Sequence, residues 1–263
     1  FCSPENIRAI KADVEVGPQI GEHEALRTLK AIAQKNKAAM KSYIGMGYNA
    51  CIVPQVILRN VLENPGWYTP YTPYQAEVSQ GRLEAMLIYQ TLVADLTGLP
   101  ISTCSLLDEA TAAAEAMRMC INHAKGKKGV KTVAVARTLH PQVIDVIKTR
   151  AEPFGVRIVE VDPLSYDPES AVDGGFCGMI VAYPNTFGTV EDYRAVAAKV
   201  HKAGGLFVVD ADLLSLALQK EPAAFGADVC VGTSGRLGTP MGYGGAHAAF
   251  LATTDRFKRI MAG

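Results

Sequence analysis

Apolar and polar positions alternate in blocks along the second half of the chain. Six short runs rich in β-branched apolar residues predict strands, at 131–136, 156–160, 178–183, 206–210, 228–231 and 246–251. Helical spacing of apolar positions predicts helices over residues 141–151 and 190–203. Strands that alternate with helices pair mostly in parallel, and the helices then cover both faces of the sheet. The pattern therefore predicts an α/β fold.

The first half shows helical periodicity. Residues 22–41 carry Leu26, Leu29 and Ile32 on one stripe, and residues 54–63 predict a short helix that starts on Pro54. A further helix is expected over residues 82–97, with Gly98 as its stop. We divide the chain into an N-terminal helical extension, residues 1–66, and a large domain, residues 67–263, that ends before it is complete.

A long alanine-rich helix is expected between these two regions of pattern. Ser105 and Asp108 have the spacing of a capping box, so the helix should open there and run to about His123. Its small residues would allow close packing against a sheet. The Gly45-Met-Gly47 stretch formally matches a dinucleotide fingerprint, but no strand precedes it and Pro54 interrupts the helix that should follow. We interpret that stretch as a plain loop.

Composition narrows the class of protein. The 263 residues include 26 basic and 26 acidic side chains, so the absence of net charge gives no reason to expect a nucleic-acid or membrane-surface partner. No apolar run approaches the roughly 20 residues needed to span a bilayer. Five histidines without metal-binding spacing predict no metal site. Six scattered cysteines favour buried free thiols: Cys2, Cys51, Cys104, Cys120, Cys177 and Cys230.

The most unusual segment is WYTPYTPYQAEVSQG, residues 67–81, which we call the strap. Prolines keep such a segment extended, and its clustered aromatic rings have polar tips. Two interpretations stay open, an ordered loop across the domain or the lining of a pocket or interface. The residues that could serve the second role are Tyr71, Tyr74, Gln75, Glu77 and Gln80.

Polar residues follow two of the predicted strands. Asp210 and Asp212 end the run LFVVDAD, and the glycine-rich stretch Thr233–Gly238 follows the run VCV. This layout resembles that of pyridoxal phosphate (PLP) enzymes of the aminotransferase-like fold type I. In that class an aspartate pairs with the pyridine nitrogen, and a lysine on the later loop forms the Schiff base. No lysine lies between Lys220 and Lys258 here, and Arg236 cannot replace it because a guanidinium stays protonated.

Two other residues are candidates for the same pocket mouth. His140 ends a predicted strand just before Pro141, where it could stack on a cofactor or simply precede a helix, and Asn185 follows the strand at 178–183. The helix N-terminus at Ser105–Thr111 is the candidate phosphate site. Its carboxylates at Asp108 and Glu109 would repel a phosphate, so helix capping is the better interpretation.

Long stretches of the chain resemble the P-protein family of the glycine cleavage system. The matching stretches, in order, are SYIGMGY (42–48), VILRNVLENPGW (56–67), YTPYQAEVSQGRLEAMLIYQTLVADLTGL (71–99), SLLDEATAAAEAM (105–117), DLLSL (212–216) and GYGGAHAAF (242–250). The chain departs from the family pattern mildly, with Ala76 and Ala246 in place of proline and Ala110 in place of glycine.

The resemblance implies a lysine-lacking N-terminal half of a two-half enzyme. In this family only the C-terminal half carries the Schiff-base lysine, so PLP is expected on that half and not on this chain. The implied reaction is decarboxylation of glycine with aminomethyl transfer to the lipoyl group of the H-protein. Implied partners are the C-terminal half, the lipoylated H-protein and glycine, in a homodimer or heterotetramer. The expected location is the mitochondrial matrix in a eukaryote and the cytoplasm in a bacterium.

The resemblance also sets the expected roles of the candidates. The strap residues are expected to reach the active site of the lysine-bearing half. His140 and Asn185 remain pocket or interface candidates, while Asp210, Asp212 and Arg236 are vestigial cofactor residues. Two alternatives remain, an autonomous PLP-dependent transaminase or lyase of the same fold, and a non-enzymatic α/β binding module. The missing lysine argues against the first and the family resemblance against the second.

Overall fold

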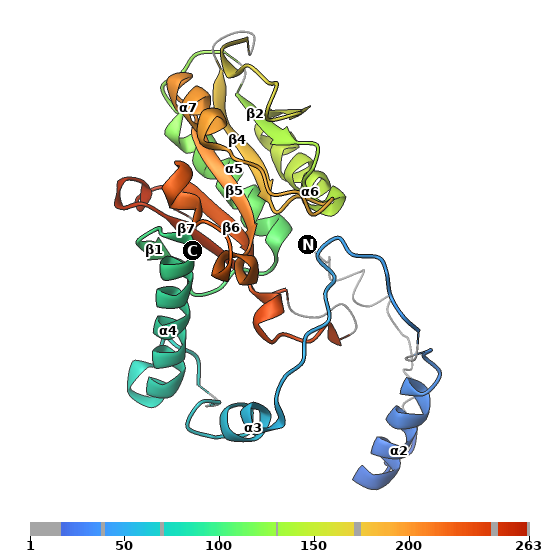
Figure 1. Cartoon of the computed structure of the whole chain (residues 1–263). Helices are drawn as coiled ribbons and strands as arrows, with labels where there is room; N and C mark the ends of the chain where they lie inside the picture. Colours follow the sequence, from blue (N-terminus) through green and yellow to red (C-terminus); the bar gives the residue numbers. More distant parts are fainter. Residues whose placement is uncertain are drawn as a thin grey trace, which may run out of the picture. The chain divides into compact units, whose positions relative to one another are not determined.

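The computed structural model describes residues 17–37, 40–68, 71–129, 131–170, 175–242 and 247–261. The chain divides into two compact units, Phe1–Ile44 and Gly45–Gly263 (Figure 1). The expected boundary between residues 66 and 67 stays a prediction. Cys2, Pro70 of the strap and Ala246 lie outside the described residues. No described helix combines the length and apolar character that a bilayer crossing requires.

The first unit contributes one described helix, α2, Glu22–Ala33. The amphipathic stripe is present, but none of its residues is buried, and Leu26, Leu29 and Ile32 remain exposed. The helix ends well before residue 41, so its predicted length is wrong. It stops where the Asn36 side-chain amide donates to the Ala33 carbonyl oxygen (3.0 Å) and satisfies one of the free carbonyls of the last turn.

The second unit is built on a seven-stranded sheet in the order β1-β7-β6-β5-β4-β2-β3. Neighbouring strands from β6 to β3 pair in parallel, while β7 runs antiparallel to both β6 and β1. The strands are β1 Ile101–Ser102, β2 Thr132–Ala136, β3 Arg157–Val161, β4 Phe176–Tyr183, β5 Leu206–Asp212, β6 Val229–Thr233 and β7 Ala249–Thr253. Most residues of β2 and β4–β7 are buried, as expected for strands covered on both faces.

Helices cover both faces of this sheet. The connection from β2 to β3 passes through α6, Pro141–Ala151, and the connection from β4 to β5 passes through α7, Arg194–Lys202. The two connections step in opposite directions across the sheet, so right-handed crossovers place α6 and α7 on opposite faces. Helix α5, Glu109–His123, packs beside α6 and across β4, β5 and β6 (Figure 1). The mostly parallel α/β fold is confirmed.

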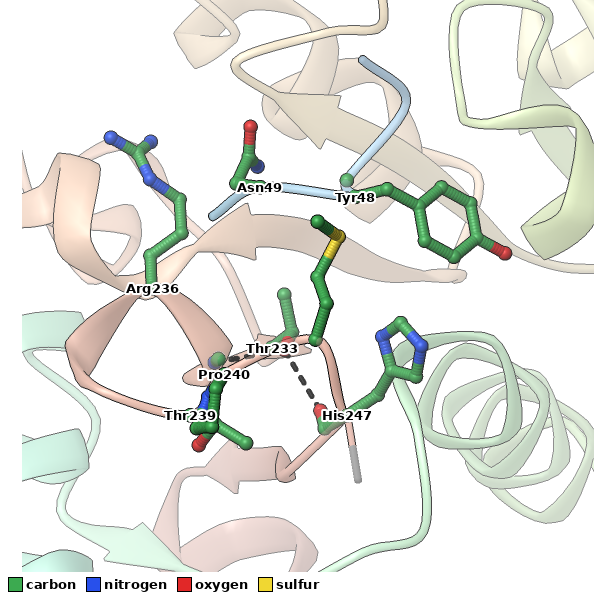
Figure 2. A pocket seen from close by; sticks show the side chains of 10 residues that line it. Tyr48, Asn49, Thr233, Arg236, Thr239, Pro240 and His247 are labelled. Atoms are coloured by element: carbon green, nitrogen blue, oxygen red, sulfur yellow. Dashed lines mark hydrogen bonds between the residues drawn. The ribbon is translucent and has the colours of Figure 1, made fainter. Parts of the chain in front are cut away.

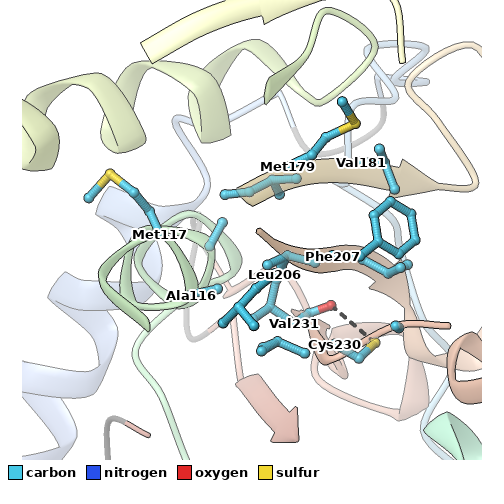
Figure 3. Packing of buried hydrophobic residues seen from close by; sticks show 14 of the residues in the cluster. Ala116, Met117, Met179, Val181, Leu206, Phe207, Cys230 and Val231 are labelled. Carbon is cyan, nitrogen blue, oxygen red and sulfur yellow. Dashed lines mark hydrogen bonds between the residues drawn. The ribbon is translucent and has the colours of Figure 1, made fainter. Parts of the chain in front are cut away.

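The core lies between α5 and the central strands. Ala116 of α5 lies against Leu206 and Val231, whereas Met179 and Phe207 point to the other side of their strands (Figure 3). Small residues on α5 allow this close approach. Cys120, Cys177 and Cys230 are buried free thiols in this core, as expected, whereas Cys51 and Cys104 are partly exposed.

The start of α5 corrects one sequence expectation. The N-cap is Asp108, whose Oδ1 accepts from the Thr111 amide (2.6 Å), and Thr111 Oγ1 accepts from the Asp108 amide (3.3 Å). The capping box therefore begins at Asp108 and not at Ser105. Residues 105–107 instead approach the sheet edge, where Leu106 forms a bridge with Ala249. Strand β1 was not predicted, because two residues carry no periodicity.

Within the second unit, shorter helices and the strap precede the first strand along the chain. Helix α3, Gln55–Ile57, continues as the π-helical turn η1, Leu58–Leu62. The strap contains the 3₁₀ turn η2, Ala76–Val78, and leads into α4, Gln80–Thr97, which ends at Gly98 in the left-handed conformation (φ 71°). The other 3₁₀ turns are η3 Glu152–Phe154, η4 Pro168–Ser170, η6 Leu213–Ala217, η7 Pro222–Phe225, η8 Gly235–Leu237 and η10 Asp255–Phe257.

Candidate functional site

The site forms at the carboxyl ends of β5 and β6. Side chains alternate along a strand, so Asp210 and Asp212 of β5 share one face while Ala211 between them points to the other. Asp210 is 4% exposed and is paired in register with Val231, two residues before the glycine-rich stretch begins. Topology thus brings the two acidic residues and the loop together, as the sequence predicted.

A second carboxyl meets Asp210 from the first turn of α5. Glu109 is hydrogen-bonded to Asp210. Burial raises the pKa of Glu109 to about 7, against the lowering effect of that hydrogen bond. Burial, with the repulsion of Glu109, also raises the pKa of Asp210 well above its ordinary value. At neutral pH the pair retains a proton.

This pair is the feature that sequence reasoning missed. Glu109 and Asp210 lie about a hundred residues apart, and Glu109 was interpreted only as a charge near a helix end. Asp210 Oδ1 has no hydrogen-bond partner among the described residues, so the buried carboxyl is served only through Glu109. No local signal links the two residues, because α5 and β5 meet only through tertiary packing.

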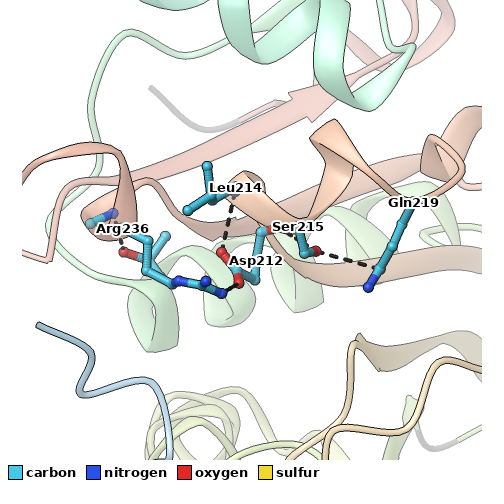
Figure 4. Close-up of polar contacts among 7 residues, drawn as sticks. Asp212, Leu214, Ser215, Gln219 and Arg236 are labelled. Atoms are coloured by element: carbon cyan, nitrogen blue, oxygen red, sulfur yellow. Dashed lines mark hydrogen bonds and ion pairs between the residues drawn. The ribbon is translucent and has the colours of Figure 1, made fainter. Parts of the chain in front are cut away.

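Asp212 has a different partner. Its Oδ2 forms an ion pair with Arg236 on η8, and its Oδ1 accepts from the Leu214 amide (3.2 Å) at the start of η6 (Figure 4). Ser215 Oγ adds a bond to the Asp212 carbonyl oxygen (2.7 Å). The Arg236 guanidinium therefore neutralises Asp212 and ties the loop after β6 to the loop after β5.

Met46, Gly47 and Tyr48 line a cavity together with Glu109. Gln142 Nε2 on α6 donates to the Met46 carbonyl oxygen (2.8 Å), and the Tyr48 ring meets the His247 ring edge-on at 5.6 Å. A Cβ placed on Gly47 would stand 3.5 Å from Glu109 Oε2 and 3.5 Å from His140 Nε2. The stretch predicted to be a plain loop therefore contacts the deepest part of the site.

Two cavities remain around this loop. The first has a volume of about 30 Å³, enough for a water molecule but not for a ring (Figure 2); its lining is Gly47, Tyr48, Asn49, Thr233, Gly235, Arg236, Thr239, Pro240, Met241 and His247. The second, of about 180 Å³, lies beside Glu109; its lining is Met46, Gly47, Tyr48, Asp108, Glu109, Ala110, Gln142, Val143, Val146 and His247. Neither lining contains a lysine.

The remaining candidates lie at or beyond the edge of this site. His140 Nδ1 is 3.0 Å from Thr186 Oγ1, and burial lowers the pKa of the imidazole. Asn185 Oδ1 accepts from the amides of Phe187 (2.9 Å) and Thr189 (3.1 Å), so this side chain closes its own turn. Asn185 lines neither cavity.

The strap residues are not brought into either cavity. Tyr71, Gln75, Glu77 and Gln80 are exposed, and Tyr74 is 95% exposed. In the described part of the strap, Ser79 Oγ donates to the Gln75 carbonyl oxygen (2.7 Å). Its role at a partner's active site stays a prediction.

The residues of this pocket do not fit PLP. A pyridinium nitrogen pairs with an ionised carboxylate, whereas burial and the neighbouring Glu109 raise the pKa of Asp210 and favour its protonated form. The first turn of α5 carries Asp108 and Glu109, which repel phosphate, and no side chain in the linings can supply the amine. Within the described ranges no group of three potential metal ligands gathers either.

Comparisons with known proteins cover the whole chain. A family model described as glycine cleavage system P-protein matches residues 2–263. The chain is 52% identical to the mitochondrial glycine dehydrogenase (decarboxylating) of Dictyostelium discoideum over 100% of its own length and 26% of the relative's. It is 50% identical to the glycine dehydrogenase (decarboxylating) of Akkermansia muciniphila over 99% of its length and 27% of the relative's. The chain thus spans about a quarter of these relatives.

Solved structures agree with the sequence comparisons. The crystal structure of an inhibitor-bound glycine decarboxylase (P-protein) matches with a TM-score of 0.85 and 34% identity, over 99% of this chain and 60% of that chain. The sphingosine-1-phosphate lyase of Burkholderia pseudomallei matches with a TM-score of 0.68 and 15% identity over 96% of this chain and 63% of that chain, a likeness of fold alone. Both support the fold type I architecture.

Proposed function

Because this chain belongs to the P-protein family of the glycine cleavage system, we propose that it is the N-terminal, lysine-lacking half of a glycine decarboxylase. The observation that carries the proposal is the pocket itself. A chain 52% identical to a glycine dehydrogenase over all its length keeps the fold but has no lysine between Lys220 and Lys258. The Glu109 carboxyl occupies the place opposite Asp210. The chemistry therefore belongs to another part of the enzyme.

The proposed reaction is decarboxylation of glycine with transfer of the aminomethyl group to the lipoyl arm of the H-protein. PLP supplies the electron sink and is held by the lysine-bearing C-terminal half, on the same chain or on a separate subunit. This half contributes support and side chains at the contact. We further propose that the assembly is a homodimer or a heterotetramer, and that it works in the mitochondrial matrix in a eukaryote and in the cytoplasm in a bacterium.

The strap is the part of this half that we propose reaches the partner's site. Exposed aromatic rings with polar tips suit surfaces that are half covered by another protein. Tyr74 is 95% exposed here, so it has no structural duty inside the described chain. Glu77 and Gln80 stand one turn further on, and Gln80 Nε2 is bonded to the Glu77 carbonyl oxygen.

The test is Tyr74→Ala in the intact enzyme, assayed by glycine-dependent release of CO₂. We expect turnover to fall by about tenfold or more with thermal stability unchanged, because the lost ring belongs to a site and not to the fold. The matched control is Leu218→Ala, a side chain that is also 95% exposed but lies after η6. Equal turnover in the two variants would remove Tyr74 from the active site.

A further inference from the structure

Three parts of this chain compete for the place that a pyridine ring would take. Glu109 stands against Asp210, the Arg236 guanidinium is held by Asp212, and the backbone at Gly47 lies over Glu109. These contacts come from α5, β5, η8 and residues 45–49, which are far apart in sequence. Gly47 lines one cavity with Arg236 and a second cavity with Glu109, so the fold brings these parts close together.

We propose that this pocket is the seat of residues 45–49 and that Glu109 closes it to a pyridine cofactor, so that restoring the missing lysine would not restore cofactor binding. The inference goes beyond the proposed function, which requires only that the lysine be absent. It assigns Glu109 the role of blocking the place that a pyridine ring would take.

The geometry carries this step. A ring at this place must lie against Asp210, but Glu109 is already hydrogen-bonded there. The direct gap between Gly47 and Glu109 has room for about one carbon and not for a ring, since an added Cβ would stand at ordinary contact distance, 3.5 Å, from Glu109 and from His140. The segment is held in place on both sides of Gly47 by the Gln142–Met46 hydrogen bond and the Tyr48–His247 ring contact.

Charge works in the same direction. Asp210 needs a hydrogen-bond partner because its carboxyl is buried, and a second carboxyl can serve it only while a proton is shared. A protonated Asp210 cannot accept from a pyridinium N–H as an ionised aspartate does. Removing Glu109 would leave Asp210 without this partner and would open the space in front of it.

The experiment introduces a lysine and tests whether Glu109 still prevents PLP from binding. Arg236→Lys is compared with the double variants Arg236→Lys/Glu109→Ala and Arg236→Lys/Glu115→Ala, each in the intact protein. Glu115 is the matched control, because it lies on the same helix but pairs at the surface with Arg150 (2.7 Å). Each variant is incubated with PLP and reduced with borohydride, and peptide mapping by mass spectrometry locates the pyridoxyl label.

We expect a label at position 236 in the Glu109→Ala double variant and at least about tenfold less in the other two. Equal labelling of Arg236→Lys alone would overturn the proposal, since the lysine would then have been the only obstacle. A folded Glu109→Ala double variant without label would overturn it as well. Peptide mapping separates position 236 from the native lysine of the other half.

A second measurement does not depend on the new lysine. Hydrogen–deuterium exchange at residues 45–49 should quicken about tenfold in Glu109→Ala and in Gln142→Ala, and stay unchanged in Glu115→Ala. The reason is that Gln142 is hydrogen-bonded to Met46 and Glu109 lines the same cavity as Gly47, whereas Glu115 is remote from the segment. Unchanged exchange in both would show that the pocket does not seat it. Glycine turnover of the same preparations reports on the proposed function separately, since that function fails at Tyr74 and not at position 236.

Discussion

Replacing Glu109 by glutamine isolates the carboxyl pair without opening a cavity. Glutamine has nearly the shape of a protonated glutamic acid and keeps a donor for the buried Asp210 carboxyl. The groups that face Glu109 are Asp210 and Asp212 from β5, Asp108 from its own helix, and His140 at the start of α6. Three of these four are carboxyls, so the negative form of Glu109 is disfavoured by repulsion as well as by burial.

The size and sign of the effect follow from the pKa. Burial raises the pKa of Glu109 from 4.5 to about 7 in the folded chain. A carboxyl that binds its proton more tightly in the folded state costs the fold stability as the pH rises through that interval. The cost is absent below about pH 4.5 and complete above about pH 7, where it amounts to roughly 3–4 kcal/mol. Glu109→Gln removes it.

Urea unfolding followed by circular dichroism measures this directly. Between about pH 4.5 and about pH 8 the glutamine variant should gain roughly 3–4 kcal/mol of unfolding free energy relative to the parent chain. The control is Glu115→Gln, which removes a carboxyl of the same helix outside the pocket and should change the pH dependence by less than about 0.5 kcal/mol. A difference between Glu109→Gln and the parent that stays flat with pH would refute the reasoning.

Two further predictions concern the fold that carries the pocket. Lys127→Met should lower the unfolding free energy by roughly 2–3 kcal/mol, because Lys127 Nζ donates to the carbonyl oxygens of Phe176 (2.8 Å), Ala203 (2.9 Å) and Gly204 (2.8 Å). The control is Lys128→Met at an exposed neighbour, which should change the unfolding free energy by less than about 0.5 kcal/mol in the same urea titration. Gly178→Ala should cost roughly 1–3 kcal/mol by thermal unfolding, because its Cβ would come within 2.5 Å of a backbone oxygen of β5; a stability equal to the parent's would contradict the packing described here.

The regular elements could be predicted because their signals are local. Helix α6 begins at Pro141 and ends at Ala151 as its apolar spacing indicated, and each predicted strand has a counterpart within a few residues. The start of α5 was misplaced because local patterns do not decide which residue caps the helix. Ser105 and Asp108 are both good capping residues, and Leu106 is drawn to the sheet by its bridge with Ala249.

The candidate site was predictable only in part. Asp210, Asp212 and the loop at 233–238 follow neighbouring strands, so strand-end reasoning brings them together. Glu109, Gly47 and Gln142 enter the same place from a helix start, a loop and a second helix, and no spacing rule links such segments. Their meeting depends on how α5 and α6 pack on the sheet. The strap is the converse case, because its composition is distinctive while its exposed side chains contact no described pocket.

The burial pattern favours a surface contribution of this half to the proposed enzyme. Most of the large apolar side chains that stay exposed lie before residue 100, among them Leu29, Ile52 and Tyr74, whereas the central strands are almost wholly buried. Exposed apolar residues in such number mark surfaces that other protein covers. The cavity beside Glu109 has no lysine in its lining, so this half offers no Schiff-base amine there. The chain can then serve glycine decarboxylation only through side chains presented outward, and those on the strap are the ones whose chemistry suits a polar active site.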